Sequence, residues 1–143
     1  MEAHYFNVNL NWLNNRKGEI SSPELATVIE VATPPPFAKG IEFIWSPEHL
    51  LTAAVNSCFM TTFLAIAENS KLEFDAMECN AVGTLDKVEG KYQITEITLF
   101  PIVKILDEVQ KDKAIRVMEM SEKACLISNS IKSKVILEPK VTW

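Results

Sequence analysis

Cysteines are the side chains of this sequence with the greatest scope for chemistry. Cys58, Cys79 and Cys125 are odd in number and far apart, which excludes the disulfide framework of a small secreted domain. No C-x-x-C occurs, and the only histidines are His4 and His49, so the sequence offers no plausible ligand set for zinc. A cysteine with a function here would therefore act as a reactive thiol.

The segment that carries Cys58 has the pattern of a long helix with a well-marked start. Ser46 is a natural N-cap, and Pro47 and Glu48 suit the first helical turn. Apolar residues then follow at helical spacing to about Asn69 and cover nearly every face. We expect this helix to be buried on most sides, partly by a partner subunit.

A second helix is expected from Asp107 to about Ile127, with Cys125 on its apolar stripe. Two buried helices in a domain of this size must pack on each other, so the two helical thiols can face one another. A disulfide between them would need Cα atoms within about 7 Å. Each cysteine taken alone is more often a small buried hydrophobe than a reactive group.

Strand patterns occur at residues 6–12, 25–31, 73–85, 91–103 and 134–141, and residues 25–31 are expected to form the second or third strand of the first small sheet. In the first, Phe6, Val8, Leu10 and Trp12 alternate with asparagines, which predicts one buried face. The order βββ-α-ββ-α-β lacks strict βα alternation and predicts an α+β fold. With no repeat and no linker, residues 1–143 are expected to form a single domain.

The net charge and the hydropathy of the sequence limit the kinds of partner that we expect for this protein. The net charge is −5 and no run of lysines and arginines offsets it, so nucleic acid is excluded as a partner. The N-terminus has no signal-peptide pattern. The longest apolar window, residues 50–67, contains several polar residues and falls short of the roughly 20 apolar residues of a membrane span. We therefore expect a soluble, cytoplasmic protein that does not contact a membrane.

Two segments resemble the paired cysteine motifs of the OsmC/Ohr family. SPEHLLTAAVNSCF at 46–59 resembles the first motif, and SEKACLISNS at 121–130 resembles the second. Glu48 precedes Cys58 by ten residues, and Cys125 follows 67 residues later. The element order also agrees, so the resemblance covers nearly the whole chain. It implies an OsmC-like fold with two long central helices and an intertwined homodimer.

The resemblance also implies an activity, which is thiol-dependent reduction of organic hydroperoxides without a cofactor or metal. Cys58 matches the peroxidatic cysteine and Cys125 the resolving cysteine, and their disulfide would be reduced by a small dithiol, such as a lipoyl-type dithiol. Glu48 matches the glutamate that holds an arginine, and Arg16 matches that arginine, which reaches the cysteine across the dimer. Because burial raises the pKa of a thiol, a fixed cation nearby would favour the thiolate.

Ordinary interpretations of these residues remain open. Arg16 also suits a solvated hairpin turn, and Glu48 suits the positive end of a helix dipole. Ten helical residues span about 15 Å. Either the helix bends or breaks between Glu48 and Cys58, or Glu48 holds Arg16 only in some states. Cys79 is expected to be structural, and His49 to be a surface residue without a role.

One departure from the family pattern concerns the residue after the second cysteine. In the peroxidase members a proline usually follows the resolving cysteine, whereas Leu126 follows Cys125 here. The alternative function is a non-catalytic OsmC-like dimer that binds a hydrophobic small molecule or senses redox state. Replacement of Cys58 by serine separates the two, because only an enzyme would lose turnover.

Overall fold

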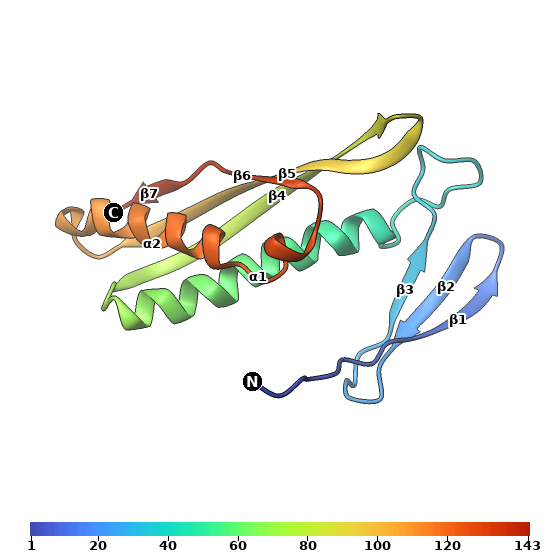
Figure 1. The fold of residues 1–143 in the computed structure, drawn as a ribbon, viewed down its shortest axis with the longest axis horizontal. Helices are drawn as coiled ribbons and strands as arrows, with labels where there is room; N and C mark the ends of the chain where they lie inside the picture. The colour runs from blue at the N-terminus through green and yellow to red at the C-terminus, as the bar shows by residue number, and fades with distance from the viewer. The chain divides into compact units, whose positions relative to one another are not determined.

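The computed structural model describes all residues, 1–143, and divides into two compact units, Met1–Leu50 and Leu51–Trp143 (Figure 1). Each unit contains one antiparallel or mixed sheet, and the second also contains most of the helical residues. The elements agree with the predicted α+β class and with the predicted order of the two long helices and the long hairpin.

The first unit is a three-stranded antiparallel sheet in the order β1-β2-β3, formed by β1 (Asn9–Asn14), β2 (Lys17–Ser21) and β3 (Ile29–Ala32). β1 and β2 are joined by a tight turn at Asn15 and Arg16, where Asn15 has a φ of 47°. Asparagine tolerates this left-handed conformation better than most residues, which explains its place in the turn. Trp12 Nε1 donates a hydrogen bond of 3.0 Å to the Asn15 carbonyl and closes the turn.

The predicted buried face of the first strand is not buried. β1 begins at Asn9 rather than near Phe6, and every one of its side chains is exposed. Trp12 keeps 74% of its surface exposed and Phe6 keeps 87%. Apolar and polar side chains do alternate along this strand, but no other element of residues 1–50 packs on its apolar face. In the single chain that face is therefore exposed to solvent.

The second unit is built on a four-stranded sheet. β4 (Phe74–Val88) and β5 (Lys91–Ile105) form the predicted long hairpin, and β6 (Lys134–Leu137) and β7 (Lys140–Thr142) both pair in parallel with β5. A single closing strand was expected. It is divided in two at Glu138 and Pro139, and proline has no N–H to offer the strand ladder.

Two long helices complete this part of the chain (Figure 1). α1 (Pro47–Asn69) begins just before the second unit, and α2 (Lys111–Ala124) follows β5 after the short 3₁₀ helix η1 (Glu108–Gln110). A second 3₁₀ turn, η2 (Ser128–Ser130), lies between α2 and β6.

The core of the second unit combines α1, β5 and α2. α1 contributes four buried residues at intervals of four, Val55, Phe59, Phe63 and Ala67. They share one cluster with Ile97, Leu99, Val103 and Ile105 of β5 and with Ala114, Val117 and Met118 of α2. Placement of α1 and α2 in one core is what the sequence predicted.

α1 differs from its sequence-based description in two ways. It buries one stripe rather than most sides, because Met60 and Leu64 are 42% and 44% exposed. The second difference is that α1 is long and apolar enough to cross a membrane, with 23 residues and a mean hydropathy of 1.7, so the prediction that this segment is too short and too polar is wrong. Core helices of folded domains can be equally long and apolar, and the buried stripe of α1 lies in such a core.

Candidate active site

The start of α1 is where the sequence predicted it. The buried Ser46 acts as N-cap, because its Oγ accepts the backbone N–H of His49 at 3.1 Å and its carbonyl accepts that of Leu50 at 2.9 Å. The predicted surface position of His49 is confirmed, but its ring takes part in the cap, with Nδ1 at 2.6 Å from Ser46 Oγ. The capped start at Pro47 fixes the register of the helix that carries Cys58.

Cys58 lies in the middle of α1, next to the core residue Phe59 and one turn before Thr62. Its side chain is partly exposed, and Sγ is 3.9 Å from the Thr62 hydroxyl oxygen. Residues four apart on a helix lie on the same face, which is why Thr62 reaches the sulfur. Thr61, by contrast, bonds the backbone carbonyl of Cys58 at 3.1 Å.

Cys125 lies at the C-terminal end of α2 and is fully buried. α2 ends at Ala124, about three residues earlier than predicted, and Cys125 is extended with φ −63° and ψ 114°. The Asn129 side chain donates to the Lys123 carbonyl at 3.2 Å and so satisfies one of the free carbonyls of the last turn. Cys125 is therefore a helix cap rather than a helical residue.

The two cysteines are close enough to interact, because the Cys125 thiol acts to lower the pKa of Cys58 and Cys58 acts to raise the pKa of Cys125. Burial acts to raise the pKa of Cys58, but four donors outweigh it and the pKa is lowered. The backbone N–H of Ile127 is the strongest of these donors, followed by the Cys125 thiol, the Thr62 hydroxyl and the backbone N–H of Leu126. Hydrogen bonds to the charged form favour the thiolate.

The pKa of Cys125 is shifted the opposite way. Burial raises it, and the hydrogen bond to Cys58 and the negative charge there raise it further. The hydroxyl and the backbone N–H of Ser128 act against these effects. Ser128 Oγ is buried and has no hydrogen-bond partner of good geometry. Of the two cysteines, Cys58 is therefore the one that loses its proton more readily.

Arg16 and Glu48 are placed by the first unit and by the start of α1. Arg16 is exposed in the β1–β2 turn, where its carbonyl accepts the Thr33 N–H at 3.2 Å. Glu48 is half-buried in the first turn of α1. α1 is one continuous helix, so the break between Glu48 and Cys58 that the spacing allowed is absent. The roles of both residues stay predictions.

Cys79 lies on β4, apart from the pair. Burial raises its pKa to about 11, and its sulfur donates to the Asn80 carbonyl at 3.7 Å. Its carbonyl accepts the Asn56 side chain at 2.9 Å. A thiol with so high a pKa is almost entirely protonated at neutral pH and is a poor nucleophile.

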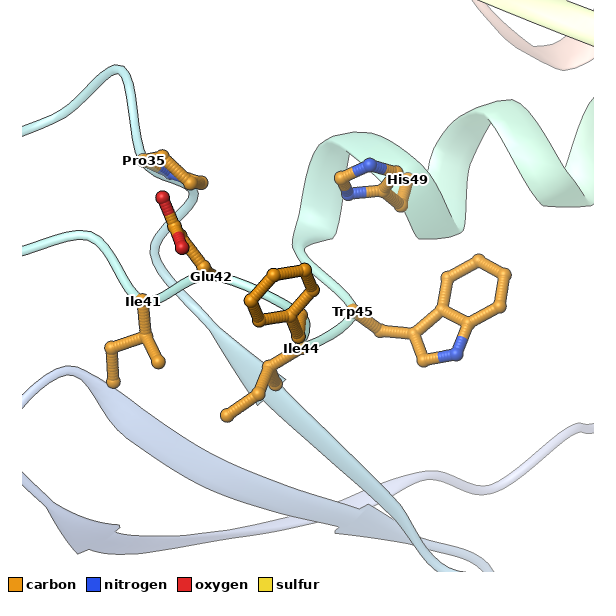
Figure 2. A pocket seen from close by; sticks show the side chains of 7 residues that line it. Pro35, Ile41, Glu42, Ile44, Trp45 and His49 are labelled. Atoms are coloured by element: carbon orange, nitrogen blue, oxygen red, sulfur yellow. The ribbon is translucent and has the colours of Figure 1, made fainter.

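An open apolar groove of about 580 Å³ lies in the first unit. It is lined by Pro35, Ile41, Glu42, Phe43, Ile44, Trp45 and His49, as Figure 2 shows. Phe43 is fully exposed and has a φ of 65°, a left-handed conformation that costs a bulky residue about 1–3 kcal/mol. The groove thus offers an apolar surface with a carboxylate and an imidazole at its margin.

Sequence patterns did not predict four residues that act on the pKa of Cys58 or Cys125, which are Thr62, Leu126, Ile127 and Ser128. Thr62 had a usable signal in its spacing of four from Cys58. Leu126 had one in its departure from the proline of the family motif. A sequence cannot otherwise indicate which backbone N–H groups act on a site, because every residue except proline carries one.

Comparisons with known proteins place the chain among OsmC-like proteins. It is 27% identical over 143 residues to the uncharacterized protein YmaD of Bacillus subtilis, covering 96% of this chain and 93% of that protein. An OsmC-like protein of unknown function from Vibrio cholerae superposes with a TM-score of 0.86 at 23% identity, over 96% of this chain and 99% of that one.

Solved structures of two organic hydroperoxide resistance proteins share the fold. The protein from Elizabethkingia anophelis gives a TM-score of 0.79 at 17% identity, over 99% of this chain and 97% of that one. OhrB of Bacillus subtilis gives 0.72 at 23% identity, over 96% and 98%. The family described as OsmC-like protein matches residues 40–140, a stretch that includes both Cys58 and Cys125. This chain belongs to the family of OsmC-like proteins.

Proposed function

We propose that this protein is a cytoplasmic, thiol-dependent peroxidase that reduces organic hydroperoxides to alcohols. The observation that carries the proposal is the interaction of Cys58 with Cys125, which accompanies a lowered pKa at Cys58 and a raised pKa at Cys125. A thiol peroxidase that works through an intramolecular disulfide needs a thiolate as nucleophile and a second thiol beside it. Relatives of similar fold that are named organic hydroperoxide resistance proteins support the same activity.

The reaction has three steps. The Cys58 thiolate attacks the terminal oxygen of the hydroperoxide, the O–O bond breaks, and the alkoxide takes a proton and leaves as an alcohol. Cys58 is then a sulfenic acid. The Cys125 sulfur attacks Cys58, and the sulfenic hydroxyl leaves with the Cys125 proton as water, which forms the disulfide. A small dithiol, such as a lipoyl-type dithiol, reduces the disulfide by exchange and becomes oxidised itself.

In this proposal Arg16 and Glu48 act in a homodimer. The exposed apolar side chains along and before β1 would be covered by a partner subunit, which accounts for the alternation that the single chain leaves open. Arg16, held by Glu48, would polarise the peroxide oxygen as charge develops on it. Arg16→Gln removes the charge and leaves a shorter polar side chain, so it tests this role directly.

The test is a thiol count with two oxidants. Fully reduced protein is mixed with one equivalent of cumene hydroperoxide or of hydrogen peroxide, and the linked cysteines are identified by peptide mass. We expect rapid loss of two thiols, a Cys58–Cys125 link, faster reaction with the organic peroxide, and recovery with dihydrolipoate. The control Cys79→Ser should lose the same two thiols. Slow, equal loss with both oxidants, or oxidation of Cys79 in place of the pair, would refute the proposal.

The groove in the first unit favours a second candidate function, which is binding of a hydrophobic small molecule without turnover. Its apolar lining and fully exposed Phe43 are typical of a surface that is covered by something else (Figure 2). Cys58→Ser decides between the two functions. A binding protein would keep its ligand after this change, whereas the peroxidase would lose all turnover.

A further inference from the structure

The two paired cysteines differ in how far a reagent from solution can reach them. Cys125 is fully buried, whereas Cys58 is partly exposed on α1. Cleavage of a disulfide by exchange requires a thiolate to attack one of the two sulfur atoms, so its rate depends on access to that atom. The difference in exposure therefore bears on which sulfur of a Cys58–Cys125 disulfide a reductant attacks.

The chain after α2 folds back on the end of that helix. We call residues 126–130 the closing turn. Asn129 ties it down at two points, because its backbone N–H donates to the Cys125 carbonyl at 3.1 Å and its side-chain Nδ2 donates to the Lys123 carbonyl at 3.2 Å. In a continuing helix, the Lys123 carbonyl would accept the N–H of the fourth residue after it. The Asn129 side chain takes the place of that donor and holds the closing turn against α2.

The inner side of the closing turn is buried. Ile127 packs against the core of the second unit, and Ser128 Oγ is buried as well. The N–H of Ser130 donates to the Ile127 carbonyl at 2.9 Å and closes the turn on itself. The hydroxyl and N–H of Ser128 both act on the pKa of Cys125, as expected for a turn that lies against its sulfur. The closing turn therefore separates Cys125 from solvent.

We propose that the closing turn shields Cys125, so that the small dithiol that recycles the protein attacks Cys58 and releases Cys125 as the leaving thiol. Asn129 is a positioning residue in this scheme, because it holds the turn over Cys125 without contacting either sulfur. The inference rests on the proposed function, since it assigns the atom at which the third step of that reaction begins.

The exchange proceeds in two attacks. A thiolate of the reductant bonds to Cys58 Sγ, the bond between Cys58 and Cys125 breaks, and Cys125 leaves with the electron pair and takes up a proton. The second thiol of the reductant then attacks the reductant sulfur on Cys58, which forms a cyclic disulfide and releases Cys58 as a thiolate. Leaving-group acidity acts the other way, because Cys58 has the lowered pKa and is the better leaving group. Access to sulfur outweighs that preference in our proposal.

The first experiment locates the mixed disulfide. The full chain is oxidised with diamide, which is not a peroxide, and then treated briefly with 2-mercaptoethanol, a monothiol that cannot complete the second attack by ring closure. Acid stops the exchange, free thiols are blocked, and peptide mass identifies the modified cysteines. We expect mercaptoethanol on Cys58 and the blocking group on Cys125. Adducts found mainly on Cys125 would overturn the proposal.

The second experiment tests the closing turn by alkylation of Cys125 with iodoacetamide, in chains carrying Cys58→Ser so that only one member of the pair reacts. If the reagent reaches Cys125 only when the turn opens, the rate follows the population of the open form. Loss of one hydrogen bond in Asn129→Ala should then raise the rate about two- to tenfold. Asn69→Ala, which removes an exposed asparagine at the end of α1, is the matched control and should leave the rate unchanged.

A pH profile separates access from acidity. Easier access raises the alkylation rate by the same factor at every pH, whereas a lower pKa of Cys125 raises it only below that pKa. An unchanged rate in Asn129→Ala, a change confined to low pH, or alkylation as fast in the folded chain as in urea would each overturn the shielding. Neither experiment uses a peroxide, so failure of the peroxidase reaction with these results intact would refute the proposed function alone.

Discussion

Thr62 provides a measurable test of how hydrogen bonding sets the reactivity of Cys58. Its hydroxyl oxygen is 3.9 Å from the sulfur, at the long end of the range for a hydrogen bond to sulfur. Thr62→Val keeps the shape of the side chain and removes this donor. Because the hydroxyl lowers the pKa of Cys58, its loss should raise that pKa.

The magnitude follows from the length of the contact. A good hydrogen bond to a charged group contributes about 1.5–3 kcal/mol. At 3.9 Å, and with Cys58 still partly exposed to solvent, about 0.5–1 kcal/mol is reasonable. That energy reduces the thiolate fraction by roughly two- to fivefold at a pH below the pKa. A more basic thiolate is also a better nucleophile, with a Brønsted slope of about 0.4–0.5, so the rate should fall only about twofold.

The assay is the rate of reaction with cumene hydroperoxide as a function of pH. Thr62→Val should be slower than the unaltered protein at low pH and equal or slightly faster at high pH, where both thiols are ionised. Thr62→Ser should restore the original profile. Thr61→Val is the matched control, because its hydroxyl bonds the Cys58 carbonyl rather than the sulfur. A uniform loss of rate at every pH would refute the reasoning, since it would mean that Thr62 positions substrate instead.

Four further predictions concern single residues. Cys58→Ser should lower the pKa of Cys125, because it removes the charge that raises it, and alkylation of Cys125 against pH measures this. Cys79, with a pKa of about 11, should be the slowest of the three thiols to alkylate at neutral pH. Phe59→Ala removes a fully buried ring stacked on Phe63 and should cost about 3–5 kcal/mol in urea unfolding, whereas the exposed Glu68→Ala should change little. Gly83→Ala should cost about 1–3 kcal/mol, because the new Cβ meets Thr52 Oγ1, and adding Thr52→Ala should recover part of that loss.

Local patterns predicted the elements that depend on local chemistry. Ser46, Pro47 and Glu48 placed the start of α1, because capping is decided by adjacent residues. The β4–β5 hairpin was predicted from its polar turn, where Glu89 and Gly90 both have positive φ. These features need no knowledge of the tertiary structure.

Features that depend on distant contacts were missed or misjudged. The alternation in β1 predicts which side chains share a face, but what covers that face is not local, and the single chain leaves it exposed. α2 was expected to continue through Cys125, yet the side chain of Asn129 folds back on the Lys123 carbonyl and the helix ends.

In the proposed mechanism, the opposite pKa shifts of the two cysteines would let one pair carry both steps in the right order. While Cys58 is a thiolate, its negative charge raises the pKa of Cys125 and so disfavours a second thiolate beside it. Oxidation of Cys58 to a neutral sulfenic acid removes that charge. The hydroxyl and amide of Ser128 then act on Cys125 with less opposition, and its pKa falls when its sulfur must attack. In this scheme the first step itself activates the second nucleophile, without requiring any movement of the fold.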